Sequence, residues 1–477
     1  MTKRQTSSLS LNEEIVTEAL KWVKGNCGTE CSKCGDYPSP RVSSEIPDCS
    51  FPMSFDQYSY CAMGCLYCFA YYMKSSNPGS SSTEVELKSV DVEGIIKAIQ
   101  GKAKGGRGRL MYDHFYSKQF PIHWGGLADP FCNFERTNKV GLRLMEFLAD
   151  EQYPTLFSFK GSTILDKPYQ KLLAKAAKNK NFAFQVSIVT GDDELAKLTE
   201  IGVPSTTKRL EVIKNLSDMG YFTILRLRPY ILGVSDVKIE SLLERALEAG
   251  IKGISTEFLA IDGRSNEGMR TRYAWLGKVM GVKNLTEYYS RMSPSERGGY
   301  MRLNRLVKEP HVRRLYDFCL KHDLVFGCSD PDFKELNTSG SCCAMPDVFK
   351  GSKLSNWTRS QLTYHLKVAR QVYHKTGKTQ YLTFSGVYGN ETYLDEPEFT
   401  MDHISKVGMS SADRIGMSYR DLLRAKWNNL DSPANPRNYL HGKVLPCGLD
   451  DKGDLKFVYV EHEYEQRWKD SGIDMTR

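Results

Sequence analysis

The residues of this chain best suited to chemistry are its cysteines, thirteen among 477 residues. Most of them lie in groups along the sequence. The first group contains Cys27, Cys31, Cys34 and Cys49, the second Cys61, Cys65 and Cys68, and the third Cys328, Cys342 and Cys343, while Cys132, Cys319 and Cys447 stand apart. Such grouping favours thiolate ligands or reactive thiols over a framework of disulfides.

The second group has a spacing that can bind three iron atoms. Cys61, Cys65 and Cys68 form a C-x3-C-x2-C run directly after a predicted strand. Three thiolates on one loop can hold three irons of a 4Fe–4S cluster and leave the fourth iron without a protein ligand. S-adenosylmethionine can chelate that iron, and its one-electron reduction gives a 5′-deoxyadenosyl radical. A structural zinc site is the alternative, although zinc normally takes four protein ligands.

With the aromatic residue Tyr67 just before its last cysteine, this run resembles the signature of the radical S-adenosylmethionine superfamily. The resemblance implies a 4Fe–4S cluster, bound S-adenosylmethionine, and an electron donor of the flavodoxin or ferredoxin type. It also implies that Tyr67 shelters the adenine side of the cofactor. Over about 51 to 233 the chain looks like the spore photoproduct lyase-like branch of this superfamily.

Four stretches carry the resemblance to that branch. They are His123-Trp-Gly-Gly-Leu-Ala-Asp-Pro-Phe, Phe157-Ser-Phe-Lys, Phe184-Gln-Val-Ser, and a longer one that contains Lys208-Arg-Leu-Glu and Arg226-Leu-Arg-Pro. The resemblance implies that Gly125, Gly126 and Asp129 lie at the amino group of the cofactor. By the same resemblance, Lys160 reaches the cofactor carboxylate, and Ser187 binds the carboxylate or the ribose.

Two departures from the branch concern the substrate. Gly126 stands where the lyase has a cysteine that returns a hydrogen atom to the product radical, and Phe69 replaces a tyrosine. Cys132, a few residues downstream, is a candidate hydrogen donor, and a buried spectator thiol is the alternative. Arg226 and Glu257, in later predicted strands, are candidate catalytic residues of the cavity.

Alternating strands and helices in the middle of the chain predict successive β/α units. We predict strands at 53–60, 120–124, 155–160, 182–189, 221–228 and 253–259. Helices between them begin near Asp166, Ser205 and Asp236. Strands joined by such helices are most simply parallel. The predicted fold class is therefore α/β, a partial barrel of six β/α units of the radical S-adenosylmethionine type, with its chemistry at the carboxyl ends of the strands.

The pattern changes on both sides of this barrel. We place boundaries near 50 and 330, which gives a cysteine-rich extension at 1–50, the barrel with a helical extension at 51–330, and a cysteine-containing α+β region at 331–477. Helical, basic stretches are expected at 269–272 and 288–305, and a strand is expected at 381–388.

The remaining cysteine groups offer further ligand sets. Cys27, Cys31, Cys34 and Cys49 supply four thiolates, for which zinc or an auxiliary iron–sulfur cluster is the natural use, with free thiols as the alternative. Cys328, Cys342 and Cys343 could be joined by Cys447 around an auxiliary cluster. The alternative is that Cys342 and Cys343 are packed or redox-active thiols. Cys319 is expected in a helix core.

The charge of the chain bears on its partners. The formal net charge is +8, which is mild for this length and compatible with a polyanion. Basic residues gather at 97–109 and again after 262, where Tyr273, Tyr288, Tyr289 and Tyr300 could stack on bases. The start of the chain lacks an apolar leader, and no segment is apolar enough to cross a membrane. We therefore expect a cytoplasmic protein without a membrane partner.

Three functions fit these observations. The first is a radical enzyme that abstracts hydrogen from a nucleobase or nucleotide in DNA or RNA, leading to modification, rearrangement or a lyase reaction. The second keeps the radical but acts on a peptide or a small metabolite. The third is a non-enzymatic nucleic-acid-binding protein whose cysteines are structural metal ligands.

Overall fold

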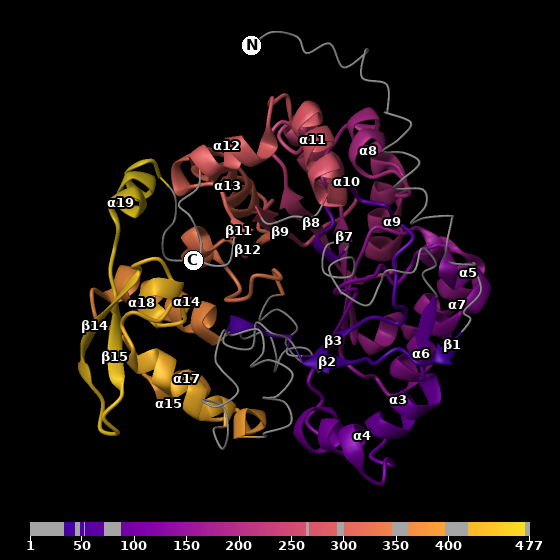
Figure 1. The fold of residues 1–477 in the computed structure, drawn as a ribbon, viewed down its shortest axis with the longest axis horizontal. Coiled ribbons are helices and arrows are strands. Elements are labelled where there is room, and N and C mark those ends of the chain that lie inside the picture. Colours follow the sequence, from indigo (N-terminus) through magenta and orange to yellow (C-terminus); the bar gives the residue numbers. More distant parts are fainter. Residues whose placement is uncertain are drawn as a thin grey trace.

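A mostly parallel sheet of eight strands forms the centre of the computed structural model. The structure describes residues 33–42, 48–51, 53–70, 87–263, 267–292, 300–345, 361–395 and 418–472. The strand order is β12-β9-β8-β7-β6-β5-β3-β2, and only β2 runs antiparallel to its neighbour (Figure 1). The strands are β2 (Arg41–Val42), β3 (Met53–Phe55), β5 (Ile122–Trp124), β6 (Thr155–Phe159), β7 (Phe182–Ser187), β8 (Phe222–Tyr230), β9 (Gly253–Phe258) and β12 (Val325–Cys328). The predicted α/β class is confirmed, and a strand lies at each of the six predicted places, although β3 ends at Phe55 rather than at residue 60. The seventh parallel strand, β12, was not predicted.

Helices connect these parallel strands. They are α3 (Val92–Ile99), α4 (Gly106–Met111), α5 (Phe134–Asn138), α6 (Val140–Asp150), α7 (Lys167–Ala176), α8 (Asp193–Thr199), α9 (Thr206–Asp218), α10 (Ile239–Glu248), α11 (Glu267–Met280), α12 (Leu285–Met292) and α13 (Arg305–Lys321). The Ser205 hydroxyl accepts a hydrogen bond from Lys208 N (3.1 Å) and caps α9, as expected. Asp166 is the residue before α7, but its side chain makes no capping hydrogen bond, and α10 begins at Ile239, three residues after Asp236. Gly220 and Gly250 follow α9 and α10 with φ of +85° and +91°, which suits glycine.

The two faces of the sheet differ in chemistry because side chains alternate along each strand. One face is packed with aromatic rings, such as Phe157 stacked on Phe184 with centroids 5.2 Å apart. Burying each such ring contributes about 1.5–3 kcal/mol. The opposite face, called the polar face below, carries His123, Ser158, Gln185, Ser187, Arg226, Arg228, Ser255 and Glu257. We therefore expect the functional residues on the polar face.

Two segments distant in the sequence cover the beginning of the polar face. Phe51, Ala344 and Met345 pack there against Leu156, Ala183 and Ile224 of β6, β7 and β8. Gln185 Nε2 donates to the carbonyl of Cys343 (2.5 Å), and Ser255 Oγ donates to that of Cys342 (3.0 Å). These contacts leave the carboxyl ends of the strands as the part of the polar face that can receive a ligand.

The C-terminal region is an α+β unit that lies beside the crossover helix α13, where Trp468 Nε1 donates to Glu309 Oε1 (3.0 Å), and away from α5 to α9 (Figure 1). It contains a small sheet in the order β13-β15-β14, and elements α14 (Gln361–Thr376), β13 (Tyr381–Leu382), α15 (Phe384–Tyr388), α17 (Tyr419–Asn428), α18 (Pro436–Tyr439), β14 (Val444–Leu449), β15 (Leu455–Tyr459) and α19 (Glu463–Asp470). The strand expected at 381–388 is wrong beyond Leu382. Thr383 ends it, because its hydroxyl accepts from Gly386 N (3.1 Å) and caps a helix instead.

Two-stranded sheets complete the fold. They pair β1 (Lys33–Gly35) with β4 (Lys88–Val90), and β10 (Ile261–Asp262) with β11 (Tyr300–Met301). Strand β11 contradicts the helix expected across 288–305, where pairing with β10 replaces helical hydrogen bonds. Among the residues described, no helix is both long and apolar enough to cross a membrane.

A buried carboxylate, Asp48, ties the segment at 48–51 to the C-terminal region. It forms an ion pair with Lys334, and it accepts hydrogen bonds from the backbone N and hydroxyl of Thr363 (2.7 Å each) and from the Tyr439 hydroxyl (3.3 Å). Because both charged side chains are nearly inaccessible, each needs the other in the folded state.

Replacing this carboxylate should therefore weaken the fold. Asp48→Ala leaves the Lys334 ammonium buried without its partner, and we expect a loss of about 3–5 kcal/mol in unfolding free energy, measured by urea denaturation. Asp150→Ala is the matched control, because Asp150 pairs with Lys175 on the surface. Equal midpoints for the two variants would contradict the assigned role of Asp48.

Candidate functional site

The cysteine loop that follows β3 is held by the last residue of α8 and the segment after it. Leu66 N donates to Thr199 O and Gly202 N donates to Met63 O, each at 3.0 Å. Gly202 is required here, since a Cβ atom would lie 2.7 Å from the carbonyl oxygen of Ala62. In this fixed loop Cys65 is buried, and Cys61 and Cys68 are partly exposed.

Asp129 links the first cysteine to the end of β6. Its backbone N donates to Cys61 Sγ (3.4 Å), and its carboxylate accepts from Phe131 N (2.9 Å), Lys160 N (2.5 Å) and Gly161 N (3.1 Å). Burial raises the pKa of Asp129, and these backbone donors oppose that shift. The carboxylate of Asp129 is thus occupied with positioning the backbone that carries Lys160.

The glycine pair after β5 permits close packing of neighbouring strand ends. Gly125 has a φ of +102°, and a Cβ atom there would lie 2.1 Å from Ser158 O. At Gly126 it would lie 2.3 Å from Ser54 Oγ. The following turn is fixed by the buried Asp56, whose carboxylate accepts from Leu127 N and Ala128 N at 2.8 Å each. The backbone contact and positive φ of Gly125 require glycine there, whereas at Gly126 the close neighbour is a serine hydroxyl that can rotate.

Glu200, which the sequence analysis did not single out, joins several predicted site residues. Its inaccessible carboxylate accepts a hydrogen bond from the Tyr67 hydroxyl. It lies 2.7 Å from the buried guanidinium of Arg209 and 3.8 Å from Lys160 Nζ. Lys160 Nζ is also 5.6 Å from the centre of the Tyr67 ring. A glutamate after a helix gives no sequence signal of its own, so only the fold reveals this role.

Arginines occupy the carboxyl end of β8. Arg226 Nη1 donates to Ser187 Oγ (3.2 Å), and Arg228 forms an ion pair with Glu257. Burial, together with the positive charges of Arg226 and Arg228, lowers the pKa of nearby His123 to about 3. His123 therefore stays neutral near pH 7, and its Nε2 lies 2.7 Å from Ser158 Oγ.

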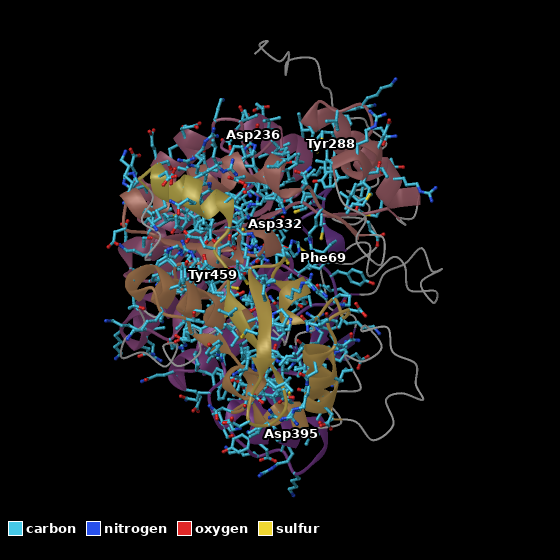
Figure 2. All side chains as sticks on the ribbon, turned by 90° about the vertical axis from the view of Figure 1, so that its left-hand side faces the viewer. Phe69, Asp236, Tyr288, Asp332, Asp395 and Tyr459 are labelled. Atoms are coloured by element: carbon cyan, nitrogen blue, oxygen red, sulfur yellow. The ribbon has the colours of Figure 1, made fainter. Side chains whose placement is uncertain are left out.

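Cys132 lies close to the site but has no accessible surface. Burial raises the pKa of its thiol to about 12, and the charge of Asp129 adds to the shift. By contrast, Phe69, the residue after the cysteine loop, has 53% of its surface exposed (Figure 2). Cys132 as hydrogen donor remains a prediction.

The other predicted ligand cysteines are distributed differently from the expected sets. Cys27 and Cys31 lie outside the described residues, and Cys34 is exposed on β1. Cys49 packs with Cys342 and Cys343 at the polar face. Cys328 points to the opposite face, with Sγ 3.9 Å from Asp330 Oδ2, while Cys447 is exposed on β14. The buried Cys319 lies on α13, as expected.

A single metal ion finds no site in the part of the chain that the structure describes. No group of three or more histidine, cysteine, aspartate or glutamate side chains there is arranged to hold one. A 4Fe–4S cluster needs its cysteine ligands farther apart than a single metal ion does, because each thiolate binds a different iron atom. The loop of Cys61, Cys65 and Cys68, with a backbone N–H directed at Cys61 Sγ, supplies the donors that such a cluster takes.

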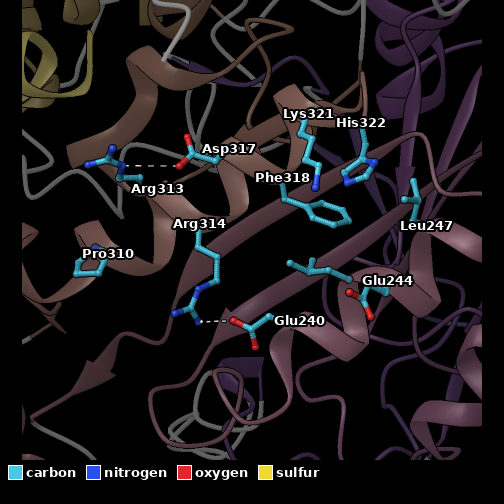
Figure 3. Close-up of a pocket in the computed structure, with 11 residues that line it drawn as sticks. Glu240, Glu244, Leu247, Pro310, Arg313, Arg314, Asp317, Phe318, Lys321 and His322 are labelled. Atoms are coloured by element: carbon cyan, nitrogen blue, oxygen red, sulfur yellow. Dashed lines mark ion pairs between the residues drawn. The ribbon is translucent and has the colours of Figure 1, made fainter. Parts of the chain in front are cut away.

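A separate cavity of about 600 Å³ lies between α10 and α13 (Figure 3). Two ion pairs lie in its walls: Arg314 Nη1 is 3.4 Å from Glu240, and Arg313 Nε is 3.7 Å from Asp317. None of the predicted site residues lines it. The cysteine loop and the polar face therefore remain the candidate site.

Comparisons with known proteins bear on this site. No protein-family model matches the chain, and no curated protein matches it. A mutant spore photoproduct lyase with bound AdoMet and dinucleoside spore photoproduct is similar in structure, with a TM-score of 0.42 and 13% identity over 61% of this chain and 77% of that one. Another mutant of that lyase, with dinucleoside spore photoproduct, has a TM-score of 0.45 and 12% identity over 69% of this chain and 87% of that one. Streptococcus suis SuiB bound to precursor peptide SuiA has a TM-score of 0.36 and 14% identity over 60% of this chain and 50% of that one.

These similarities are to a spore photoproduct lyase and to SuiB, at 12–14% identity and TM-scores of 0.36 to 0.45. The likeness is weak in sequence and in structure, so substrate and mechanism depend on the residues of this chain.

Removing the buried Glu200 should destabilise the site. Glu200→Ala leaves Arg209 buried without its counter-charge, and we expect a loss of about 3–5 kcal/mol in unfolding free energy, measured by urea denaturation. Glu194→Ala, which removes a surface partner of Lys197 on the preceding helix, should leave the midpoint unchanged. A Glu200→Ala protein as stable as that control would disprove the network.

The buried His123 should make stability fall in acid. Its folded pKa of about 3 lies below the ordinary histidine pKa of 6.5, so between these values the unfolded chain binds a proton that the folded chain does not. Stability should drop by up to about 1.4 kcal/mol per pH unit below pH 6.5. The measurement is urea denaturation of the wild type and His123→Gln at pH 7.5 and 5.0. A stability difference between them that does not change with pH would refute this assignment.

Proposed function

We propose that this chain is a radical S-adenosylmethionine enzyme whose Cys61, Cys65 and Cys68 bind a 4Fe–4S cluster. The observation that carries the proposal is one backbone-fixed loop with three thiols, placed directly after a parallel strand beside Tyr67, Lys160 and Glu200. The eight-stranded sheet is then interpreted as a partial β/α barrel whose lumen is the polar face, with chemistry at the carboxyl ends of its strands.

When bound, the cluster and S-adenosylmethionine would supply radical chemistry that abstracts hydrogen from a substrate. The protein residues position the cofactor. The Lys160 ammonium, held at 3.8 Å from Glu200, offers a charge for a carboxylate. Tyr67, whose hydroxyl is anchored on Glu200, offers a ring for the adenine side. Gly125, Gly126 and Ser187 line the adjoining strand ends, and Glu257 keeps Arg228 in place. An external flavodoxin or ferredoxin would supply the electron.

We favour a nucleobase or nucleotide of DNA or RNA as the substrate. Support comes from the two guanidiniums inside the polar face, Arg226 and Arg228, because arginine pairs well with phosphate. A duplex would have to present its base outside the helix to reach such a site. The basic helices after 262 add less support than expected, since Tyr273 and Tyr289 are buried and cannot stack on bases.

Reconstitution without oxygen tests this proposal. Wild-type protein with iron, sulfide, reductant and S-adenosylmethionine should release 5′-deoxyadenosine, measured by liquid chromatography. Cys65→Ala should lose at least a hundredfold of that release and the electron paramagnetic resonance signal of the reduced cluster. Cys34→Ala, which changes an exposed cysteine on β1, is the control and should retain both. Absence of release from cluster-loaded wild type would end the proposal.

A further inference from the structure

A chain of hydrogen bonds crosses the polar face from β5 to β7. His123 Nε2 lies 2.7 Å from Ser158 Oγ, and Ser158 Oγ donates to Gln185 Oε1 (2.8 Å). Gln185 Nε2 in turn donates to the carbonyl oxygen of Cys343 (2.5 Å). Because Ser158 and Gln185 are buried, each of their polar atoms depends on these partners.

The carbonyl group of Cys343 sets the direction of this chain. A carbonyl oxygen can only accept, so the amide nitrogen of Gln185 faces it and the amide oxygen faces Ser158. The Ser158 hydroxyl donates its single proton to that amide oxygen and must therefore accept from His123. Since the pKa of about 3 keeps the imidazole neutral, its one proton is on Nε2 and Nδ1 carries a lone pair.

A ligand on the polar face can reach the imidazole ring. His123 is the next-to-last residue of β5 and is partly exposed, and no donor among the described residues is hydrogen-bonded to Nδ1. Arg226 and Arg228, which are also partly exposed on this face, carry donors only. A phosphate or carboxylate offers acceptors alone and cannot use Nδ1. The edge of a nucleobase combines C=O and N–H groups, which suits an acceptor placed among donors.

We propose that His123 binds a nucleobase of the substrate by accepting, at Nδ1, a hydrogen bond from a ring or amino N–H. This inference rests on the proposed function and narrows it, because the base must carry a proton on the edge that faces β5. Ser158 and Gln185 act as positioning residues that hold the tautomer. Without them the proton could move to Nδ1, which would then be a donor.

The test compares nucleotides by isothermal titration calorimetry in the reconstituted protein, with S-adenosylmethionine bound and without reductant. The probes are uridine monophosphate and adenosine monophosphate, each paired with a derivative whose ring or amino N–H is replaced by methyl groups. In the wild type at least one nucleotide should bind at least about tenfold more tightly than its derivative. Arg143→Gln, which alters an arginine paired with Glu93 on the surface, is the control and should keep this preference.

Two amide variants separate ligand binding from a purely structural role. In His123→Asn the short side chain can place its amide oxygen near the position of Nδ1, so the preference for the N–H should persist. In His123→Gln the longer side chain can still reach Ser158 but leaves no acceptor near Nδ1, so each nucleotide and its derivative should bind equally. If His123 were only structural, neither variant would change the preference.

Three results would overturn this assignment. The first is a wild type that binds each nucleotide and its derivative equally, or binds none of the probes. The second is a His123→Gln protein that keeps the preference. The third is a His123→Gln protein that loses affinity for S-adenosylmethionine, which would assign Nδ1 to the amino group of the cofactor. Thermal melting identifies a variant that does not fold, and the wild-type comparison then decides. Nucleotide binding needs no radical chemistry, so its failure is distinguishable from absence of 5′-deoxyadenosine release.

Discussion

The buried carboxylate of Glu200 is the interaction on which the arrangement of the site depends. It receives the hydroxyl of Tyr67 from the cysteine loop, pairs with Arg209 of α9, and lies near Lys160 at the end of β6. Three separate segments are thereby fixed to one point. Since a carboxylate without these partners would be costly to bury, the loop cannot move away from the strand ends without exposing an unpaired charge.

Backbone contacts reinforce this constraint. The segment at 199–202 pairs with the loop at 63–66, and a larger residue than Gly202 would collide with the loop. Asp129 fixes the first cysteine of the loop in a similar way. Its backbone N donates to Cys61 Sγ, and its carboxylate accepts a hydrogen bond from the backbone N of Lys160. Donors and charges fixed in advance would cost no reorganisation on binding the proposed cofactor. The polar residues around the loop thus stabilise the fold and at the same time fix the positions of the site residues.

Local signals in the sequence were enough to predict most of the eight-stranded sheet and its connecting helices. Apolar runs such as 182–189 and the capping residue Ser205 encode their own elements, so the strands and crossover helices could be predicted. Strand β12 could not, because only four residues pair with β9 after a long excursion through α11, α12 and α13. The same applies to Glu200, to Asp56, and to the meeting of Cys49 with Cys343, which depend on contacts between distant segments.

The cysteines show why spacing alone is an incomplete guide. Sequence proximity grouped Cys328 with Cys342 and Cys343, but alternation along β12 sends Cys328 to the opposite face of the sheet from the loop that packs on Gly327. Cys49 reaches the polar face from the other end of the chain because Asp48 is anchored by Lys334 and Thr363. The C-terminal region therefore helps to close the beginning of the polar face, and it acts on the site through packing even though its own elements lie outside the sheet.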